Sequence, residues 1–154
     1  MREIKFRAKP NMAYFFESDN VPTFDGFVFG TPDTRMLNVP GADKWRKEHK
    51  MVDQPSIVAM TRDGWPCSVV VIEDTIGEFT GLYDKNGKEI YEGDVVKSNC
   101  NFHGLVRWHK NGYFYIDENP DKVIESDFTP LGEMLKFASF EVIGNAYDNP
   151  ELLK

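Results

Sequence analysis

Apolar and charged residues alternate at the start of the chain. In REIKFRA (residues 2–8) the apolar side chains fall on one face of an extended segment and the charged side chains on the other. This period of two predicts a half-buried strand over residues 3–8, with Ile4 inside and Arg7 outside. Residues 10–42 then mix aromatic residues with prolines and glycines, which predicts turns and short pieces; FDGFVFG (24–30) could form a strand.

Helical spacing comes next, followed by two apolar runs. In ADKWRKEHKMV, Asp43 and Lys47 are an opposite-charge pair four residues apart, and prolines bound the stretch on both sides. We therefore expect a helix near residues 43–52. SIVAM and CSVVVIE predict two strands near residues 56–73, separated by a turn at Asp63-Gly64.

From Gly77 onward the pattern changes to short strands punctuated by turns, which predicts a compact all-β unit. One short helix is expected in TPLGEMLKFA, with Thr129 as its N-cap and Pro130 at the first helical position. The end repeats this arrangement, with Asn149 as cap, Pro150 after it and a single turn over the last residues.

The stretch TGLYDKNGKEIYEGDVV (residues 80–96) crowds four carboxylates around an Asn-Gly pair. A calcium-binding EF-hand loop needs glycine at its sixth position and a carboxylate at its twelfth, and a loop counted from Asp84 has neither. DKNG instead suits a type I turn with Gly87 in the left-handed conformation, as a glycine bulge. This register sets Asp84 opposite Lys88 and Tyr83 opposite Glu89.

A second hairpin is predicted at HKNG (residues 109–112), with the same three-residue loop. That loop pairs Trp108 with Phe114, whereas a two-residue Asn-Gly loop would mix apolar and polar residues on each face. The preferred register leaves four residues on the other face: Arg107, His109, Tyr113 and Tyr115.

A bend at Gly93-Asp94, followed by short strands and tight turns, predicts a small β-barrel of the SH3 type. We expect a mainly β chain, α+β overall. An N-terminal α/β segment would occupy residues 1–76 and the SH3-type barrel residues 77–154.

Composition narrows the classes of function. The 154 residues carry 25 acidic and 18 basic side chains, a net charge of −7 that disfavours nonspecific attraction to nucleic acid or anionic lipid. No apolar run is long enough to span a bilayer, and the first residues lack the apolar stretch of a secretory signal. We therefore expect a cytoplasmic protein with no membrane partner, in which Cys67 and Cys100 are reduced thiols.

Candidate catalytic and metal groups are weak. Cys100 and His103 are three apart, with His109 and His49 left to complete a zinc site, but such sites usually show two such pairs. Cys67, before an apolar run, is more typical of a small core residue than of a nucleophile. The sequence has no phosphate-binding glycine loop and no serine-nucleophile elbow. We expect no enzyme, no cofactor, no metal and no catalytic residue.

Two surfaces are candidates for binding. A basic patch lies on the expected helix: Lys44, Trp45, Arg46, Lys47 and Lys50. It could meet nucleic acid or an acidic partner, although a solvated helix with internal ion pairs explains it as well. The other surface is the face of Arg107, His109, Tyr113 and Tyr115. Its residue types suit a partner surface, and packing against the N-terminal segment is the alternative.

Three blocks of the sequence resemble the YopX-like family of proteins encoded by phages and prophages: MREIKFRA, TGLYDKNGKEIYEGDVV and EVIGNAYDNPELL. The resemblance implies an SH3-type barrel in the C-terminal half and a self-associating protein in a bacterial cell. It brings no established activity, cofactor or catalytic residue. The chain departs from the family at Lys9-Pro10, where Trp-Asp is common, and the segment up to Ile76 looks longer than usual. Partner specificity could lie in that segment.

We therefore expect a phage or prophage accessory protein that acts by protein–protein contact or self-assembly, as a homo-oligomer or with an unidentified phage or host protein. The alternative is a nucleic-acid-binding module that uses the Lys44–Lys50 helix. That alternative predicts binding that weakens steeply with salt. An enzyme comes third, with Cys67 or Cys100 as its reactive group.

Overall fold

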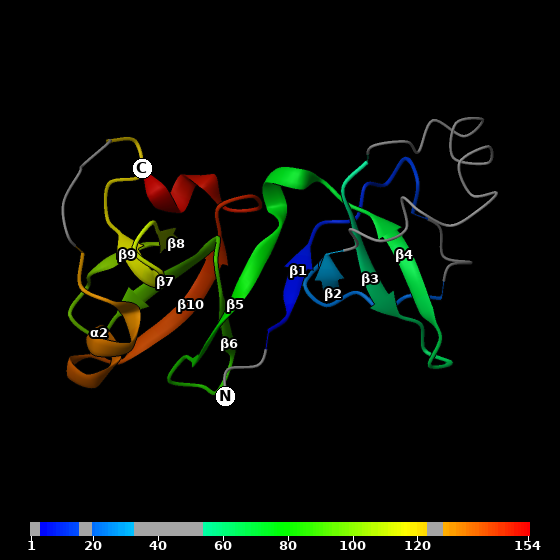
Figure 1. Cartoon of the computed structure of the whole chain (residues 1–154). Helices are drawn as coiled ribbons and strands as arrows, with labels where there is room; N and C mark the ends of the chain where they lie inside the picture. The colour runs from blue at the N-terminus through cyan, green and yellow to red at the C-terminus, as the bar shows by residue number, and fades with distance from the viewer. Residues whose placement is uncertain (1–3, 16–19, 33–53, 123–127) are drawn as a thin grey trace. The chain divides into compact units, whose positions relative to one another are not determined.

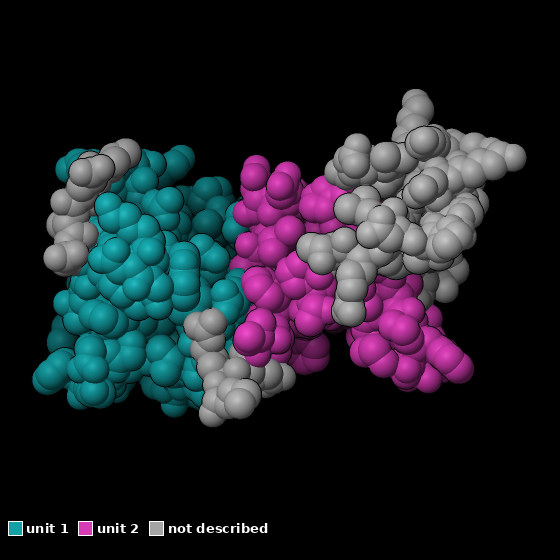
Figure 2. Space-filling model, viewed as in Figure 1, with its two compact units in different colours: residues 1–3, 78–154 teal, residues 4–77 magenta. Residues whose placement is uncertain are grey.

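The computed structural model describes residues 4–15, 20–32, 54–122 and 128–154 (Figure 1). The chain divides into two compact units, residues 4–77 and residues 78–154 (Figure 2). The expected helix near residues 43–52, with the basic patch of Lys44, Trp45, Arg46, Lys47 and Lys50, lies outside the described residues.

The first unit is built on antiparallel strands in the order β4-β3-β2-β1. The elements are β1 (Phe6–Ala8), β2 (Val28–Pro32), β3 (Ser56–Met60), β4 (Pro66–Val70) and the 3-10 turn η3 (Glu73–Thr75). Its buried core consists of aliphatic side chains: Ala8, Val21, Val28, Ile57, Ala59, Val69 and Val71. The two strands predicted near residues 56–73 are confirmed. Gly64, at φ +84°, lies in the predicted turn between them.

The opening strand differs from its prediction. Ile4 was expected inside, yet 66% of it is exposed, whereas Arg7 was expected outside and only 6% of it is exposed. The physical reason is a neighbouring aromatic ring: the Arg7 guanidinium carbon lies 4.3 Å from the centre of the Phe27 ring. A cation held over an aromatic face can be buried more easily than an isolated charge.

The second unit is also mostly strand. Its elements are β5 (Gly77–Tyr83), β6 (Glu89–Tyr91), β7 (Asp94–Ser98), β8 (His103–His109), β9 (Tyr113–Asp117), α2 (Leu131–Phe137), β10 (Phe140–Asn145) and η4 (Pro150–Leu153). β5 and β6 form a hairpin, and an antiparallel sheet has the order β10-β7-β8-β9. The core joins the strands to α2 through Ile90, Val96, Val106, Phe114, Ile116, Leu131 and Phe140. The prediction of a mainly β, barrel-like fold is confirmed.

Both predicted Asn-Gly hairpins form. Gly87 and Gly112 have φ of +78° and +89°, and each donates its backbone N–H back across the turn, to the carbonyl oxygens of Asp84 and His109. In the β8–β9 hairpin Trp108 lies opposite Phe114 as predicted. In the β5–β6 hairpin Tyr83 lies opposite Glu89 as predicted, but a register shift between Phe79 and Tyr83 was not foreseen.

The helix caps are less well predicted. α2 takes Pro130 as its N-cap and begins at Leu131, so the assignment of Thr129 as cap is wrong by one position. The Pro130 carbonyl accepts the backbone N–H groups of Glu133 and Met134, which makes Pro130 the N-cap, and the buried Leu131 attaches this end of the helix to the core. At the end of the chain Asn149 is the N-cap of η4, as predicted. Its side chain makes no capping bond and accepts instead from the backbone N–H of Asn145, at 3.3 Å.

Candidate functional site

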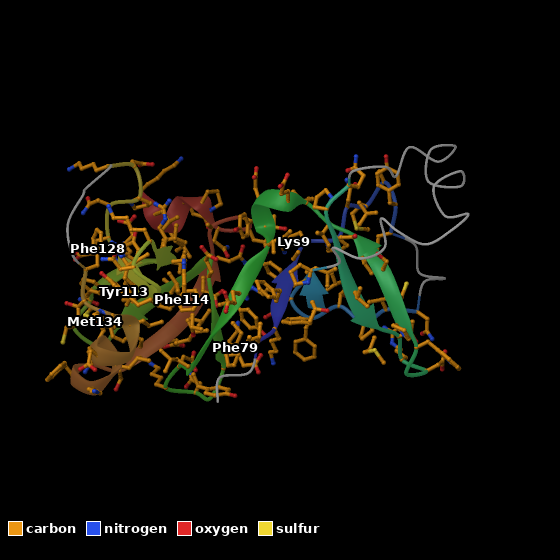
Figure 3. All side chains as sticks on the ribbon, in the orientation of Figure 1. Lys9, Phe79, Tyr113, Phe114, Phe128 and Met134 are labelled. Carbon is orange, nitrogen blue, oxygen red and sulfur yellow. The ribbon has the colours of Figure 1, made fainter. Side chains whose placement is uncertain are left out.

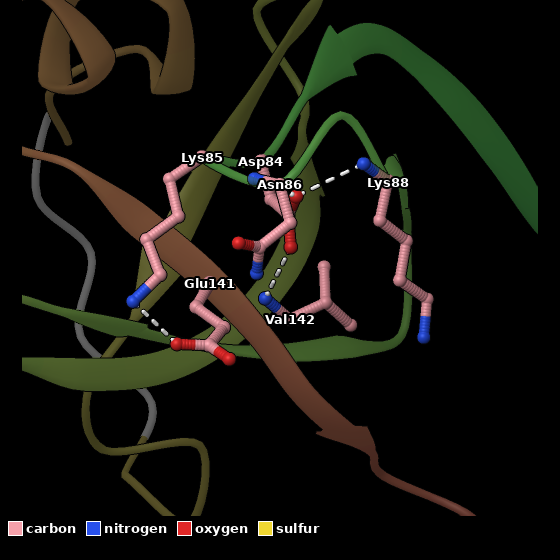
Figure 4. A network of polar contacts seen from close by, with 6 residues as sticks. All are labelled: Asp84, Lys85, Asn86, Lys88, Glu141 and Val142. Carbon is pink, nitrogen blue, oxygen red and sulfur yellow. Dashed lines mark hydrogen bonds and ion pairs between the residues drawn. The ribbon is translucent and has the colours of Figure 1, made fainter.

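The conspicuous carboxylates of residues 80–96 bind backbone groups of the protein itself. Asp84 is 7% exposed, at the tip of the β5–β6 hairpin. Its Oδ1 accepts the backbone N–H groups of Asn86 and Lys88 at 2.8 and 2.9 Å, and its Oδ2 accepts the N–H of Val142 on β10 at 3.0 Å (Figure 4). One side chain thus orders its own turn and attaches that turn to a strand 58 residues away.

Electrostatics favour the ionised form of Asp84. Burial by itself would raise its pKa, but the backbone hydrogen bonds from Val142, Lys88 and Asn86 outweigh burial and lower the pKa. Hydrogen bonds to a carboxylate stabilise its charge, so these three N–H groups account for the lowered pKa. An ion pair lies beside this network: Lys85 Nζ is 2.6 Å from Glu141 Oε2, and each side chain is a little under half exposed. Such surface pairs contribute little to stability.

Glu92 and Asp94 lie in the bend between β6 and β7. Asp94, 1% exposed, accepts the backbone N–H of Tyr91 at 2.8 Å. Burial raises the pKa of Glu92, hydrogen bonds from the backbone of Trp108 and Glu78 lower it, and the charge of Glu78 raises it; the net shift is upward. Asp94 therefore serves the backbone of the bend, which is the role that the turn chemistry predicted for it, whereas the backbone partners of Glu92 lie on β5 and β8.

The face predicted as a partner surface is only partly open. Arg107 lies opposite Tyr115, and His109 lies opposite Tyr113, so the four side chains share one face of the β8–β9 hairpin. His109 and Tyr115 are each 9% exposed. Phe128, which is labelled in Figure 3, follows β9 in the chain. Its ring stacks on the Tyr115 ring with centroids 4.2 Å apart and meets the His109 ring with centroids 6.2 Å apart.

Arg107 and Tyr113 form the open part of this face, and each is held in place. The Arg107 side chain is 46% exposed, and its Nη1 lies 3.1 Å from Oδ2 of the buried Asp117. The Tyr113 ring stacks on His109, with centroids 4.6 Å apart and planes 17° apart. We call Arg107 and Tyr113 the Arg107–Tyr113 surface.

The inner residues of this face, His109 and Tyr115, have contacts within the hairpin. Burial raises the pKa of Tyr115, although the nearby charge of Arg107 lowers it in part, so the phenol stays protonated at neutral pH. His109 Nδ1 accepts the backbone N–H of Asn111 at 3.2 Å, within the turn. These groups fix the hairpin.

The remaining candidates do not come together. Cys67 is half-buried against the core of the first unit, and Cys100 is exposed; both are free thiols. Among the residues that the structure describes, no group of three His, Cys, Asp or Glu side chains could hold a metal ion. His49 lies outside those residues. The structure therefore does not test the candidate zinc site made of His49, Cys100, His103 and His109.

Two contacts of the candidate site were not predicted from the sequence. Phe128 was not predicted to be part of this face, because its contacts with Tyr115 and His109 leave no signal in the local sequence. The Asp84–Val142 bond joins two blocks of the family resemblance, TGLYDKNGKEIYEGDVV and EVIGNAYDNPELL. Its signal was the presence of both blocks, because local spacing cannot show a contact over such a separation.

Comparisons with known proteins give a family and a fold. No curated protein matches the chain. Among solved structures, the chain is similar to protein EF1440 from Enterococcus faecalis, at 22% identity over 100% of both chains and a TM-score of 0.50. This likeness concerns the fold alone. Within the described residues, no helix has the length and apolar character needed to cross a bilayer.

The family model for the YopX protein matches residues 34–154. That range includes the whole second unit, with both hairpins and the Asp84 network. The chain belongs to the YopX family.

Proposed function

We propose that this protein is a non-enzymatic accessory protein of a phage or prophage, working in the cytoplasm of the bacterial host by protein–protein contact. Contact between copies of the chain is included, so that a homo-oligomer is expected. The Arg107–Tyr113 surface is the proposed point of contact.

The observation that carries this proposal is that an exposed arginine and a half-buried tyrosine, both of types favoured at binding hot spots, are held in fixed positions. Arginine and tyrosine are over-represented among residues that dominate binding energy. Asp117 holds Arg107 by its ion pair, and His109 holds Tyr113 by stacking. Side chains that are already ordered lose less conformational entropy when a partner binds, so they give more affinity for the same contact area.

Solution mass tests the proposal. Light scattering of the full chain is expected to show a species larger than a monomer, and the Arg107→Ala/Tyr113→Ala variant is expected to show a lower mass. Tyr83→Ala/Lys97→Ala is the matched control, because it likewise removes one tyrosine and one exposed cation, but from β5 and β7. It should leave the mass unchanged.

Two results would count against the proposal. A monomeric wild type that captures no partner from host lysate leaves the surface without an occupant. If the double variant associates as the wild type does, the contact lies on another surface of the protein. If mass is gained only with mixed short nucleic acids at low salt, the alternative of nucleic-acid binding through the Lys44–Lys50 helix takes its place.

A further inference from the structure

The tips of the two hairpins of the second unit repeat one tripeptide, Lys-Asn-Gly, at residues 85–87 and residues 110–112. Both asparagines are exposed. An asparagine followed by glycine is prone to spontaneous deamidation, because glycine leaves its own backbone nitrogen open to attack the side-chain amide. Since the residue before each asparagine is also the same, the two sites have nearly matched intrinsic reactivity.

In both turns the attacking nitrogen is occupied. Gly87 N–H donates to the Asp84 carbonyl at 3.0 Å, and Gly112 N–H donates to the His109 carbonyl at 2.9 Å. The reaction therefore requires the turn to open first, and its rate in the folded protein depends on how often each turn opens.

The two turns are held by very different contacts. At Asn86 the buried carboxylate of Asp84 binds two N–H groups of the turn and one of β10, and the Lys85 backbone N–H donates to the Phe140 carbonyl at 2.8 Å. At Asn111 the corresponding side-chain acceptor is a single ring nitrogen, Nδ1 of His109, at 3.2 Å from the Asn111 nitrogen. Hydrogen bonds to a charged acceptor are the stronger kind.

We propose that Asn111 is a site of spontaneous deamidation in the folded protein, and that Asp84 protects Asn86 from the same reaction. The Gly112 nitrogen forms a bond to Cγ of Asn111, and the side-chain nitrogen leaves as ammonia, taking up the proton that the glycine nitrogen loses. Water then opens the cyclic imide to give aspartate or isoaspartate. No oxidant or reductant takes part.

The product would change the Arg107–Tyr113 surface. Asn111 is two residues from Tyr113, and its N–H is bound by the histidine on which Tyr113 stacks. Deamidation adds a negative charge there, and the isoaspartate form also lengthens the backbone of the turn. The inference about Asn111 stands on the turn contacts alone and does not depend on the proposed function.

The test follows both asparagines in the full chain during incubation at mildly alkaline pH, by peptide mass mapping with detection of isoaspartate. In denaturant the two sites are expected to react at comparable rates. In native buffer Asn111 should react at least about tenfold faster than Asn86, because one charge-assisted hydrogen bond shifts an opening equilibrium by about that factor or more. Equal native rates, a faster Asn86, or no reaction at Asn111 would each overturn the proposal.

Two variants sharpen the assignment. Asp84→Asn should accelerate the reaction at Asn86 and leave the rate at Asn111 unchanged; equal acceleration at both sites would show that Asp84 acts through global stability and would overturn its protective role. Asn111→Gln should abolish the modified species in the β8–β9 peptide. The wild-type comparison alone decides the main claim if Asp84→Asn does not fold.

Discussion

Asp84 satisfies three backbone N–H groups with two oxygens, so its replacement should be costly. We expect Asp84→Asn to lower the free energy of unfolding by about 1–3 kcal/mol, because an asparagine amide nitrogen cannot accept the N–H of Val142. Lys85→Ala is the control, since it removes only the exposed ion pair with Glu141 and should cost well under about 1 kcal/mol. Urea unfolding measures the free energy of unfolding of both variants. Equal losses of stability would contradict the importance of the buried network.

The pKa shifts of Asp84 and Glu92 have opposite signs, which gives a second prediction at this scale. A lowered pKa means that Asp84 contributes stability above the pKa of the unfolded chain, about 4, and loses it as pH falls through the folded-state value. A raised pKa means that the contribution of Glu92 is complete below about pH 4 and is lost as pH rises through its folded-state value.

The stability gap between wild type and Asp84→Asn should therefore shrink on acidification below about pH 4. The stability of the wild type relative to Glu92→Gln should fall as pH rises from about 4 toward neutrality. Comparing slopes against pH removes the constant cost of each substitution. Parallel slopes for the two pairs would contradict the assigned signs.

At the scale of elements, two glycines of the β8–β9 hairpin serve different purposes. Gly112 has φ of +89° with nothing near an added Cβ, so Gly112→Ala should cost only the conformational penalty of about 1–2 kcal/mol. A Cβ on Gly104 would lie 2.6 Å from the Asp117 carbonyl oxygen and from Ile116 Cγ2. Gly104→Ala should thus cost more than Gly112→Ala, because strand β9 would have to move. Thermal unfolding of the two variants checks the order, and the reverse order would be inconsistent with this packing.

The elements that the sequence predicted well are those fixed by local chemistry. The HKNG turn determines its own register, because a three-residue loop with glycine in the left-handed conformation separates apolar from polar side chains along both strands. The pairs from Trp108–Phe114 to Arg107–Tyr115 follow from that one choice. The two strands on either side of Gly64 were equally predictable, because an apolar run lies on each side of a clear turn.

The contacts that the sequence did not predict are those made between distant segments. Arg7 is buried by the ring of Phe27, which directly precedes β2, and Phe128 covers Tyr115 from beyond the end of β9. The alternating pattern at residues 3–8 counted Arg7 as solvent-facing because it carries no information about Phe27. For the same reason, the sequences of β8 and β9 alone could not show how much of the face of Arg107 and Tyr115 is exposed to solvent.

At the scale of the whole molecule, the net charge of −7 determines how salt should act on the proposed self-association. Copies of an acidic chain repel one another at long range, and salt screens that repulsion beyond a Debye length of about 10 Å at 0.1 M. The Arg107–Tyr113 surface acts at contact distance, and the charge of Arg107 is already matched by Asp117. We therefore expect the solution mass at neutral pH to hold or increase as salt is raised.

Binding of nucleic acid would respond in the opposite direction, because releasing counterions from phosphates becomes less favourable with added salt. Light scattering across a salt series, with and without mixed short nucleic acids, measures both trends on one sample. A mass that falls with salt in the protein alone would contradict a contact made through the Arg107–Tyr113 surface, because an already neutralised arginine and a tyrosine ring have little charge for salt to screen.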